Sequence, residues 1–222
     1  MKIENIKACV FDAYGTLFDV NSAAAKCKEK LGSKWEGFAN AWRTTQLEYT
    51  WLRSLMKKHK NFWEITEDSL DHTMETFKIK KEMRNELLDL YKKLNPYPEV
   101  KECLEGLKDK KIKIAILSNG TPDLIRGLVK SNNIQNYFDD IFSIESVGIY
   151  KPDSKVYELP IKKYNCKPEN ICFMSSNTWD VSGGGVFGYN AVWINRLNKV
   201  FDKLSYKPKF IINNLEELLK II

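Results

Sequence analysis

Six short apolar runs, rich in β-branched residues, recur along the chain and predict the strands of a sheet. They occupy residues 7–11, 112–117, 141–144, 171–174, 191–194 and 210–212. Between several of these runs the apolar residues recur at helical spacing instead, as in Val100, Cys103, Leu104 and Leu107. Strands that alternate with helices are typical of a parallel sheet covered by helices. The pattern therefore predicts an α/β fold with a doubly wound, Rossmann-like core.

The segment from residue 19 to residue 95 has a different pattern, without any strand-like run. Phe38, Trp42, Tyr49, Leu52 and Met56 recur on one helical face. Two further helices are predicted, over about residues 67–77 and 80–94. We therefore expect a helical cap domain of residues 19–95, inserted into a core domain made of residues 1–18 and 96–222.

Two local sequence features disfavour helices that the alternation of strands and helices predicts. Gly183-Gly184-Gly185 lies early in the helix expected after residues 171–174, and each glycine costs up to ~1 kcal/mol relative to alanine. Pro160 lies inside another expected helix, where it predicts a kink. The last residues, 215–222, predict a short terminal helix.

Composition and charge narrow the class of protein. The 222 residues are 43% hydrophobic and carry a formal net charge of +6, which favours a globular fold over disorder. Lys57–Lys60 form the densest basic stretch, and a solvated helix end explains it better than a nucleic-acid site. The five cysteines lack metal or redox spacing. We expect a reduced, cytoplasmic protein without a signal peptide, membrane partner or nucleic-acid partner.

Polar residues follow the predicted strands at the edge where an open parallel sheet usually holds its active site. They comprise Asp12, Ser118, Asn119, Lys151, Ser175, Ser176, Asn177 and Asp180. Each alone could be ordinary loop polarity, and Asp12 could simply form the turn before Gly15. A carboxylate that ends a buried strand needs a charged partner, for which Lys151 is the candidate. Together they indicate a site built around an ionised nucleophile.

Several motifs carry a resemblance to a known superfamily. They are FDAYGTLFDV (11–20), WR and QLEY (42–49), SNG (118–120), VGIYKPD (147–153), SSNTWD (175–180) and WINR (193–196). The first resembles the leading motif of the haloacid dehalogenase superfamily. The whole set, above all SSNTWD, resembles the L-2-haloacid dehalogenases, and it spans nearly the entire chain.

Two features distinguish the chain from the phosphatases of that superfamily. Phosphatases carry a general-acid Asp two residues after the nucleophile, where this chain has Tyr14, and acidic Mg²⁺ ligands where it has Ser175-Ser176. A phosphoryl group needs a metal and its alkoxide leaving group needs a proton. A halide needs neither when it leaves a monoanionic substrate. The resemblance therefore implies metal-independent hydrolysis of short (S)-2-haloacids to (R)-2-hydroxyacids, without a cofactor.

The resemblance also implies roles for the catalytic residues. Asp12 would displace halide from the α-carbon and form an ester. Thr16, Ser175 and Lys151 would orient Asp12 and stabilise its charge. Arg43, on a cap helix, would guide the substrate and accept the halide; without the motif it would be taken as a surface arginine.

Other residues would bind the substrate and the hydrolytic water. Ser118 and Asn119 would hold the substrate carboxylate, while Asn177, Tyr157 and Asp180 would organise Lys151 and the water. Four residues would form the apolar wall: Tyr14, Leu47, Phe62 and Trp179. Without the motif, Tyr157 and Trp179 could equally be packing residues.

Some expectations lie outside the motifs, and two alternatives stay open. The resemblance implies a homodimer. His59 and His72 fall in the cap and are expected at the surface, while Thr44, where the family commonly has Gln, predicts a different pocket rim. A metal-dependent phosphatase of the same superfamily is one alternative. A non-catalytic binding module that keeps the fold is the other.

Overall fold

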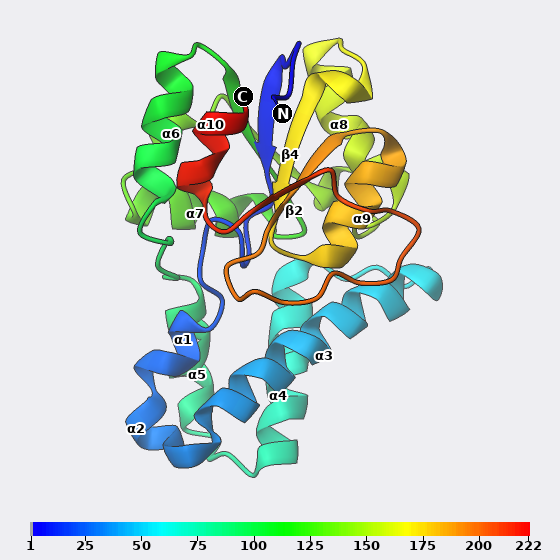
Figure 1. Ribbon diagram of the computed structural model, residues 1–222. Helices are drawn as coiled ribbons and strands as arrows, with labels where there is room; N and C mark the ends of the chain where they lie inside the picture. Colours follow the sequence, from blue (N-terminus) through cyan, green and yellow to red (C-terminus); the bar gives the residue numbers. More distant parts are fainter. Residues whose placement is uncertain (1) are drawn as a thin grey trace.

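The computed structural model describes residues 2–222, which form a sheet lobe and a helical lobe (Figure 1). The sheet lobe contains one six-stranded sheet in the order β3-β2-β1-β4-β5-β6. Its strands are β1 (Ala8–Phe11), β2 (Lys113–Ser118), β3 (Asp140–Ser143), β4 (Ile171–Ser175), β5 (Asn190–Ile194) and β6 (Phe210–Ile212). All five pairings are parallel. The predicted doubly wound α/β class is confirmed.

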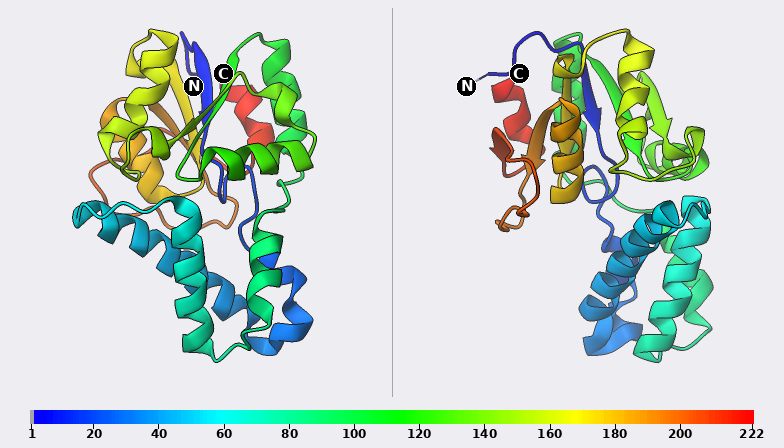
Figure 2. Two further views of the ribbon diagram at one scale, coloured as in Figure 1. Left: turned by 180° about the vertical axis from the view of Figure 1, so that it is seen from behind. Right: turned by 90° about the vertical axis from the view of Figure 1, so that its right-hand side faces the viewer.

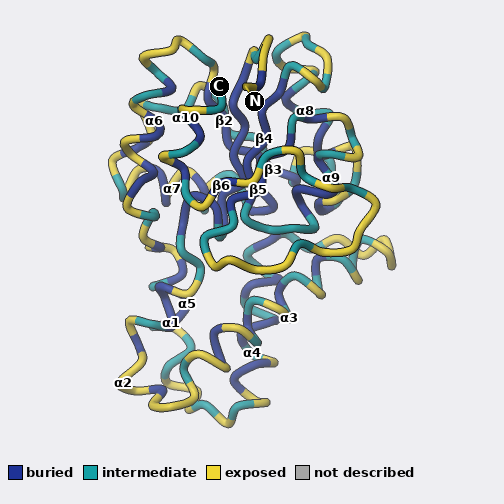
Figure 3. The backbone as a smooth tube through the Cα atoms, in the orientation of Figure 1, coloured by how far each residue is buried: buried dark blue, intermediate teal, exposed yellow. Residues whose placement is uncertain are grey.

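Helices lie against both faces of this sheet (Figure 2). They are α6 (Val100–Asp109), α7 (Pro122–Ser131), α8 (Ser154–Tyr164), α9 (Thr178–Phe187) and α10 (Leu218–Ile221). Short 3-10 turns occupy Gln135–Tyr137, Ile144–Ser146, Pro168–Asn170 and Leu215–Glu217. All four residues of β1 are fully buried, and β1, β2, β4 and β5 form the buried centre of the lobe (Figure 3). Asp12, the first polar residue after β1, therefore lies directly next to the buried interior of the lobe.

The helical lobe lies beyond the carboxyl ends of the strands (Figure 1). Within residues 2–222 it contains five α-helices. They are α1 (Ser22–Lys26), α2 (Lys28–Leu31), α3 (Trp35–Leu55), α4 (Phe62–Phe77) and α5 (Met83–Tyr91), with a 3-10 turn over Gly32–Lys34. A capping box starts α4 earlier than the predicted residue 67: Asn61 Oδ1 accepts from Glu64 N at 3.0 Å, and Asn61 N donates to Glu64 at 3.3 Å. The helix predicted over 80–94 is shorter, as α5.

The long helix α3 only partly follows the predicted apolar face. Phe38 and Trp42 are buried, but Leu52 is 50% exposed and Met56 is 60% exposed. The end of α3 extends past the helices that cover its beginning (Figure 1), so the sequence pattern overstated the buried length. Within the described residues, no helix is both long enough and apolar enough to cross a bilayer.

The chain passes between the two lobes twice, and the two crossings are paired. Asp19 N donates to Asn95 O at 2.9 Å, and Tyr97 N donates to Leu17 O at 3.0 Å. The paired residues lie at positions 17–19 and 95–97. The division into core and cap domains stays a prediction.

The glycines of α9 have a packing reason. A Cβ on Gly183 would lie 2.5 Å from the Tyr157 hydroxyl oxygen, and a Cβ on Gly184 would lie 2.7 Å from the Phe173 ring. Any larger residue would push α9 away from its neighbours, so the helical propensity that glycine lacks is offset by close approach. Pro160 lies inside α8 without interrupting it.

Candidate active site

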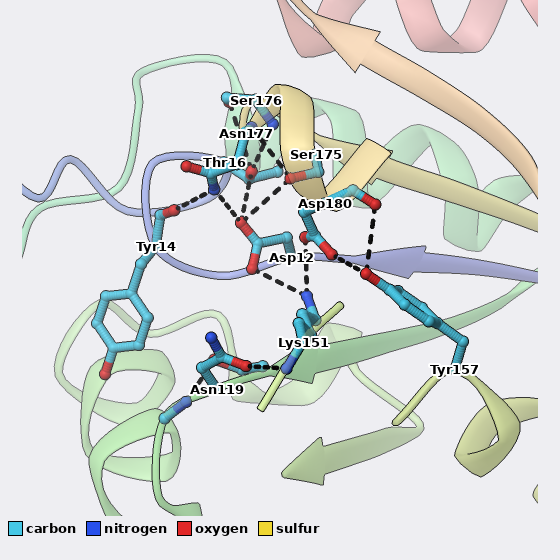
Figure 4. Close-up of polar contacts among 12 residues, drawn as sticks. Asp12, Tyr14, Thr16, Asn119, Lys151, Tyr157, Ser175, Ser176, Asn177 and Asp180 are labelled. Atoms are coloured by element: carbon cyan, nitrogen blue, oxygen red, sulfur yellow. Dashed lines mark hydrogen bonds and ion pairs between the residues drawn. The ribbon is translucent and has the colours of Figure 1, made fainter. Parts of the chain in front are cut away.

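The ends of three neighbouring strands bring the predicted polar residues together (Figure 4). Asp12 directly follows β1, Ser118 is the last residue of β2, and Ser175 is the last residue of β4. Because β1 pairs with both β2 and β4, these residues lie side by side at the carboxyl edge. Lys151 reaches the same point from the loop between β3 and α8.

Asp12 is the centre of this arrangement, and only 5% of its surface is exposed. Its Oδ2 faces three donors: Asn177 Nδ2 at 2.9 Å, Thr16 Oγ1 at 3.0 Å and Ser175 Oγ at 3.4 Å. Its Oδ1 accepts only from Lys151 Nζ, at 3.2 Å. The two oxygens of one carboxylate therefore differ in how many lone pairs remain free.

Lys151 is fully buried and joins two carboxylates. Its Nζ lies 2.9 Å from Asp180 Oδ2 and 3.2 Å from Asp12 Oδ1. Burial opposes the charge of Lys151, but the two carboxylates outweigh that effect and raise its pKa above the usual value. Burial raises the pKa of Asp180 to about 6, although Lys151 and the Tyr157 hydroxyl, which donates at 2.7 Å, counteract the shift.

At the same edge, the loop after β2 carries hydrogen-bond donors that have no acceptor within the described residues. Asn119 Oδ1 accepts from Lys151 N at 3.2 Å, which turns the Asn119 amide nitrogen away from Lys151, and within residues 2–222 that nitrogen has no acceptor. Ser118 Oγ accepts from Gly120 N at 3.0 Å and keeps its own proton free. The Tyr14 hydroxyl is buried and lacks a hydrogen-bond partner in the described chain. Burial raises the pKa of Tyr14, which keeps the hydroxyl protonated.

The helical lobe contributes Arg43 from α3. Arg43 is half-exposed, and its Nη1 donates to Gln46 Oε1 at 2.9 Å. Gln46 is buried, and its Nε2 donates to Thr66 Oγ1 at 2.7 Å and to the Tyr91 hydroxyl at 3.0 Å. Thr66 uses its own proton on Phe62 O at 2.7 Å. Thr66 can therefore only accept from Gln46, and this orients the amide oxygen toward Arg43.

Aromatic rings fill the space between the lobes. The Tyr14 ring lies 5.1 Å from that of Phe62 and stacks on Tyr91 at 5.7 Å between centroids. Trp179 packs edge-on against Trp51 of α3 at 5.4 Å. Both rings of the first contact are buried, which places Tyr14 and Phe62 in one apolar wall.

A cleft of about 390 Å³ is lined by residues of both lobes, but neither Tyr14 nor Phe62 lines it. Arg43 from the helical lobe lines it together with Asn177, Trp179 and Arg196 from the sheet lobe. Leu47 is half-exposed on α3 and does not line this cleft. The cleft thus brings a guanidinium from α3 to the loop that holds Asp12.

Three residues of this neighbourhood were given no role from the sequence, although two of them lie in the quoted motifs: Gln46, Tyr91 and Arg196. Gln46 lies one helical turn after Arg43, and Arg196 directly follows the end of β5, so each had a positional signal. Tyr91 had none, because only folding brings α5 against α3. His59 is exposed, as expected, but its Nε2 also lies 3.0 Å from Glu145 of the sheet lobe. His72 is exposed.

Within residues 2–222 no group of three or more His, Cys, Asp and Glu side chains is arranged to hold a metal ion. Lys151, and not a cluster of carboxylates, faces Asp12.

Comparisons with known proteins agree with this geometry. The family of haloacid dehalogenase-like hydrolases matches residues 6–188. The chain is 40% identical to (S)-2-haloacid dehalogenase 1 of Pseudomonas sp. (strain CBS-3), over 99% of this chain and 98% of that protein. It is 41% identical to the (S)-2-haloacid dehalogenase of Pseudomonas fluorescens, over 97% and 96%.

Among solved structures, the L-2-haloacid dehalogenase of Xanthobacter autotrophicus with chloropropionic acid covalently bound is 31% identical, with a TM-score of 0.90 and 97% of each chain covered. Another dehalogenase is 36% identical with a TM-score of 0.97, over 99% of this chain and 98% of its own. Strand order, site geometry and full-length similarity agree, and the chain belongs to the (S)-2-haloacid dehalogenase family of the haloacid dehalogenase-like hydrolases.

Proposed function

We propose that this enzyme hydrolyses short (S)-2-haloacids to (R)-2-hydroxyacids through an ester on Asp12, without a metal ion. The observation that supports this proposal most directly is the environment of the Asp12 carboxylate. Three donors hold one of its oxygens, and the Lys151 ammonium holds the other. The names of the relatives support the substrate class. The chloropropionic acid covalently bound in the Xanthobacter autotrophicus enzyme supports a covalent route.

In the first step Asp12 Oδ1 attacks the α-carbon. Oδ2 is occupied by three donors, whereas Oδ1 has one and retains a lone pair for attack. A carbon–oxygen bond forms as the carbon–halogen bond breaks, and the halide leaves with the electron pair. In-line displacement inverts the α-carbon. Arg43, across the cleft, receives the halide with its free guanidinium donors.

In the second step water attacks the ester carbonyl carbon of Asp12. Oδ2 is then the carbonyl oxygen, and Thr16, Ser175 and Asn177 stabilise the negative charge that develops on it. Asp180, with a pKa of about 6, accepts the proton of the water. The bond between the Asp12 carboxyl carbon and Oδ1 then breaks, and the protonated Asp180 returns its proton to Oδ1, which leaves as the hydroxyl of the product. The remaining proton of the water passes to solvent, which restores the carboxylate.

The substrate is held by groups that surround Asp12. Ser118 and the uncommitted amide of Asn119 bind its carboxylate, while Tyr14, Phe62, Leu47 and Trp179 surround the side chain and halogen. Residues 19–95 act as a cap over the core, and the protein works as a cytoplasmic homodimer. Light scattering on the purified protein tests the dimer.

The decisive experiment follows the oxygen during a single turnover with excess enzyme in ¹⁸O-water. Because the product hydroxyl comes from Asp12, the first-turnover hydroxyacid should be almost unlabelled, and the Asp12 peptide should carry the label. Water attack on the α-carbon gives the same inversion but a labelled product, and that result would reject the ester. Asp12→Asn, assayed soon after purification, should release no halide.

Metal independence needs its own measurement. Halide release should be unchanged by a chelator, because Lys151 supplies the cation beside Asp12. Loss of turnover in chelator with recovery in Mg²⁺ would contradict this. A generic phosphate ester, assayed with and without Mg²⁺, should give no hydrolysis and so tests the phosphatase alternative.

A further inference from the structure

Arg196 lies at the carboxyl edge just after β5, and only 14% of its side chain is exposed. Its Nη1 donates to Ser176 Oγ at 3.0 Å and Gly15 O at 3.4 Å. Its Nη2 donates to Thr16 O at 3.0 Å and Glu99 Oε1 at 2.7 Å, and its Nε donates to Glu99 at 3.1 Å. A guanidinium has five N–H donors. All five are therefore committed within the protein.

Two of these partners, Ser176 and Thr16, belong to the hydrogen-bond network that holds Asp12. Ser176 N donates to Thr16 Oγ1 at 2.9 Å, and Thr16 Oγ1 donates to Asp12 Oδ2 at 3.0 Å. Ser176 Oγ donates to Gly15 O at 2.6 Å. Arg196 thus holds the loop after β1 against the loop after β4, at the point where the Thr16 hydroxyl is aimed at Asp12.

Arg196 also joins the two crossings between the lobes. Gly15 and Thr16 precede the first crossing, while Tyr97 and Glu99 belong to the second. The guanidinium lies 3.9 Å from the Tyr97 ring centroid, and Glu99, which is 9% exposed, balances its charge. A planar guanidinium can stack on a ring while two of its N–H groups donate to one carboxylate oxygen, here Glu99 Oε1, which an ammonium cannot do.

We infer that Arg196, anchored by Glu99, is a positioning residue that sets the orientation of Asp12 through Thr16 and Ser176. This rests on the proposed role of Asp12 as nucleophile. Arg196 lines the cleft, which would suggest binding of the substrate carboxylate, but no N–H remains for it. Its function is therefore to fix the geometry of attack and not to hold substrate.

The test compares Arg196→Lys with wild type and with Arg126→Lys, a matched change at an exposed arginine of α7. Single-turnover halide release from (S)-2-chloropropionate should slow about 10- to 100-fold, as expected for a misplaced nucleophile. KM should stay within about threefold, because no substrate contact is lost. Arg126→Lys should behave as wild type.

A double-mutant cycle separates positioning from general stability. In a Thr16→Val background, which itself lowers the rate, Arg196→Lys should have less than about a twofold further effect on the rate, because its path to Asp12 is already broken. A raised KM with a normal rate, or fully additive losses in rate, would overturn the inference.

Glu99→Gln gives a second test if Arg196→Lys folds poorly. It keeps the side-chain shape but removes the charge that anchors Arg196, and the halide-release rate should again fall with KM little changed. A normal rate in Glu99→Gln would overturn the anchoring role. If the wild-type enzyme releases no halide from any 2-haloacid, the proposed function is wrong. A normal rate in the variants, with an active wild type, would instead contradict only the positioning role of Arg196.

Discussion

The sheet edge and helix α3 face the same cleft, but they hold their charged side chains differently. Lys151 at the sheet edge has no exposed surface and is bonded to two carboxylates. Arg43 on α3 is half-exposed, and within residues 2–222 its one side-chain hydrogen bond is to the buried Gln46. The sheet lobe thus provides a preorganised charge network, whereas the helical lobe provides one cation with donors to spare.

This difference fits the chemistry proposed for each side. Asp12 must keep one orientation through two steps, so its partners gain from fixed positions in a dry interior. A halide acceptor must bind a departing ion and then release it, so Arg43 gains from contact with solvent. Removing a charge should therefore affect both stability and turnover at the sheet edge, but mainly turnover on α3.

The largest effect is expected for Lys151→Met. Halide release should fall by about 10³-fold or more, because Asp12 loses its cation. At neutral pH the free energy of unfolding should fall by about 3–5 kcal/mol, since two buried carboxylates lose their partner. Without Lys151, which lowers the already raised pKa of Asp180, that pKa moves further above the unfolded-state value, so the deficit should shrink as the pH falls.

Denaturant unfolding at pH 5 and pH 7.5 measures this, with Lys155→Met at an exposed position of α8 as the control. A Lys151→Met protein as stable as wild type at pH 7.5 would mean that the buried charges are not coupled as described.

Arg43→Ala should come next. Turnover should fall by about 10²-fold, while the free energy of unfolding should change by less than about 0.5 kcal/mol, because the side chain is half-exposed. Glu48→Ala, an exposed charge on the same helix, should leave both unchanged. Near-normal halide release by Arg43→Ala would remove α3 from the chemistry.

A smaller effect is expected from pH. Protonation of Asp180, whose pKa is about 6, removes the proton acceptor and weakens its hold on Lys151. Turnover should therefore fall below pH 6, by about tenfold between pH 7 and pH 5. Because this pKa lies above the ordinary carboxyl value, the contribution of Asp180 to folding is favourable below that ordinary value. It is lost as the pH rises through about 6. A turnover profile that is flat from pH 5 to pH 8 would contradict the role of Asp180.

The smallest effect is expected where the lobes touch outside the site. His59 and Glu145 form a partly exposed pair at 3.0 Å. His59→Gln should lower the free energy of unfolding by less than about 1 kcal/mol and keep turnover within about twofold. His72→Gln, at an exposed position within the helical lobe, is the matched control. A loss of turnover comparable to that of Arg43→Ala would show that this contact positions the lobes.

Local patterns predicted the elements well where one periodicity dominated. The six apolar runs became the six strands, because a buried parallel strand must be apolar on both faces. The end of α3 was less predictable, because Leu52 and Met56 continue the apolar spacing but are exposed. Burial on this helix stops where the helices packed against it end, and the spacing of apolar residues does not show that point. The α9 glycines were read as a cost, because their close neighbours Tyr157 and Phe173 come from other elements.

The sequence by itself determined the α/β class, the placement of Asp12, Lys151, Ser175 and Asp180 on the carboxyl side of the strands, and the family. These follow from periodicity and motifs, which are local properties. Only the tertiary structure decided which Asp12 oxygen is left free, how Gln46 is oriented against Arg43, and that all five N–H groups of Arg196 are used. Such features depend on distances between segments far apart in the chain, which local patterns do not encode.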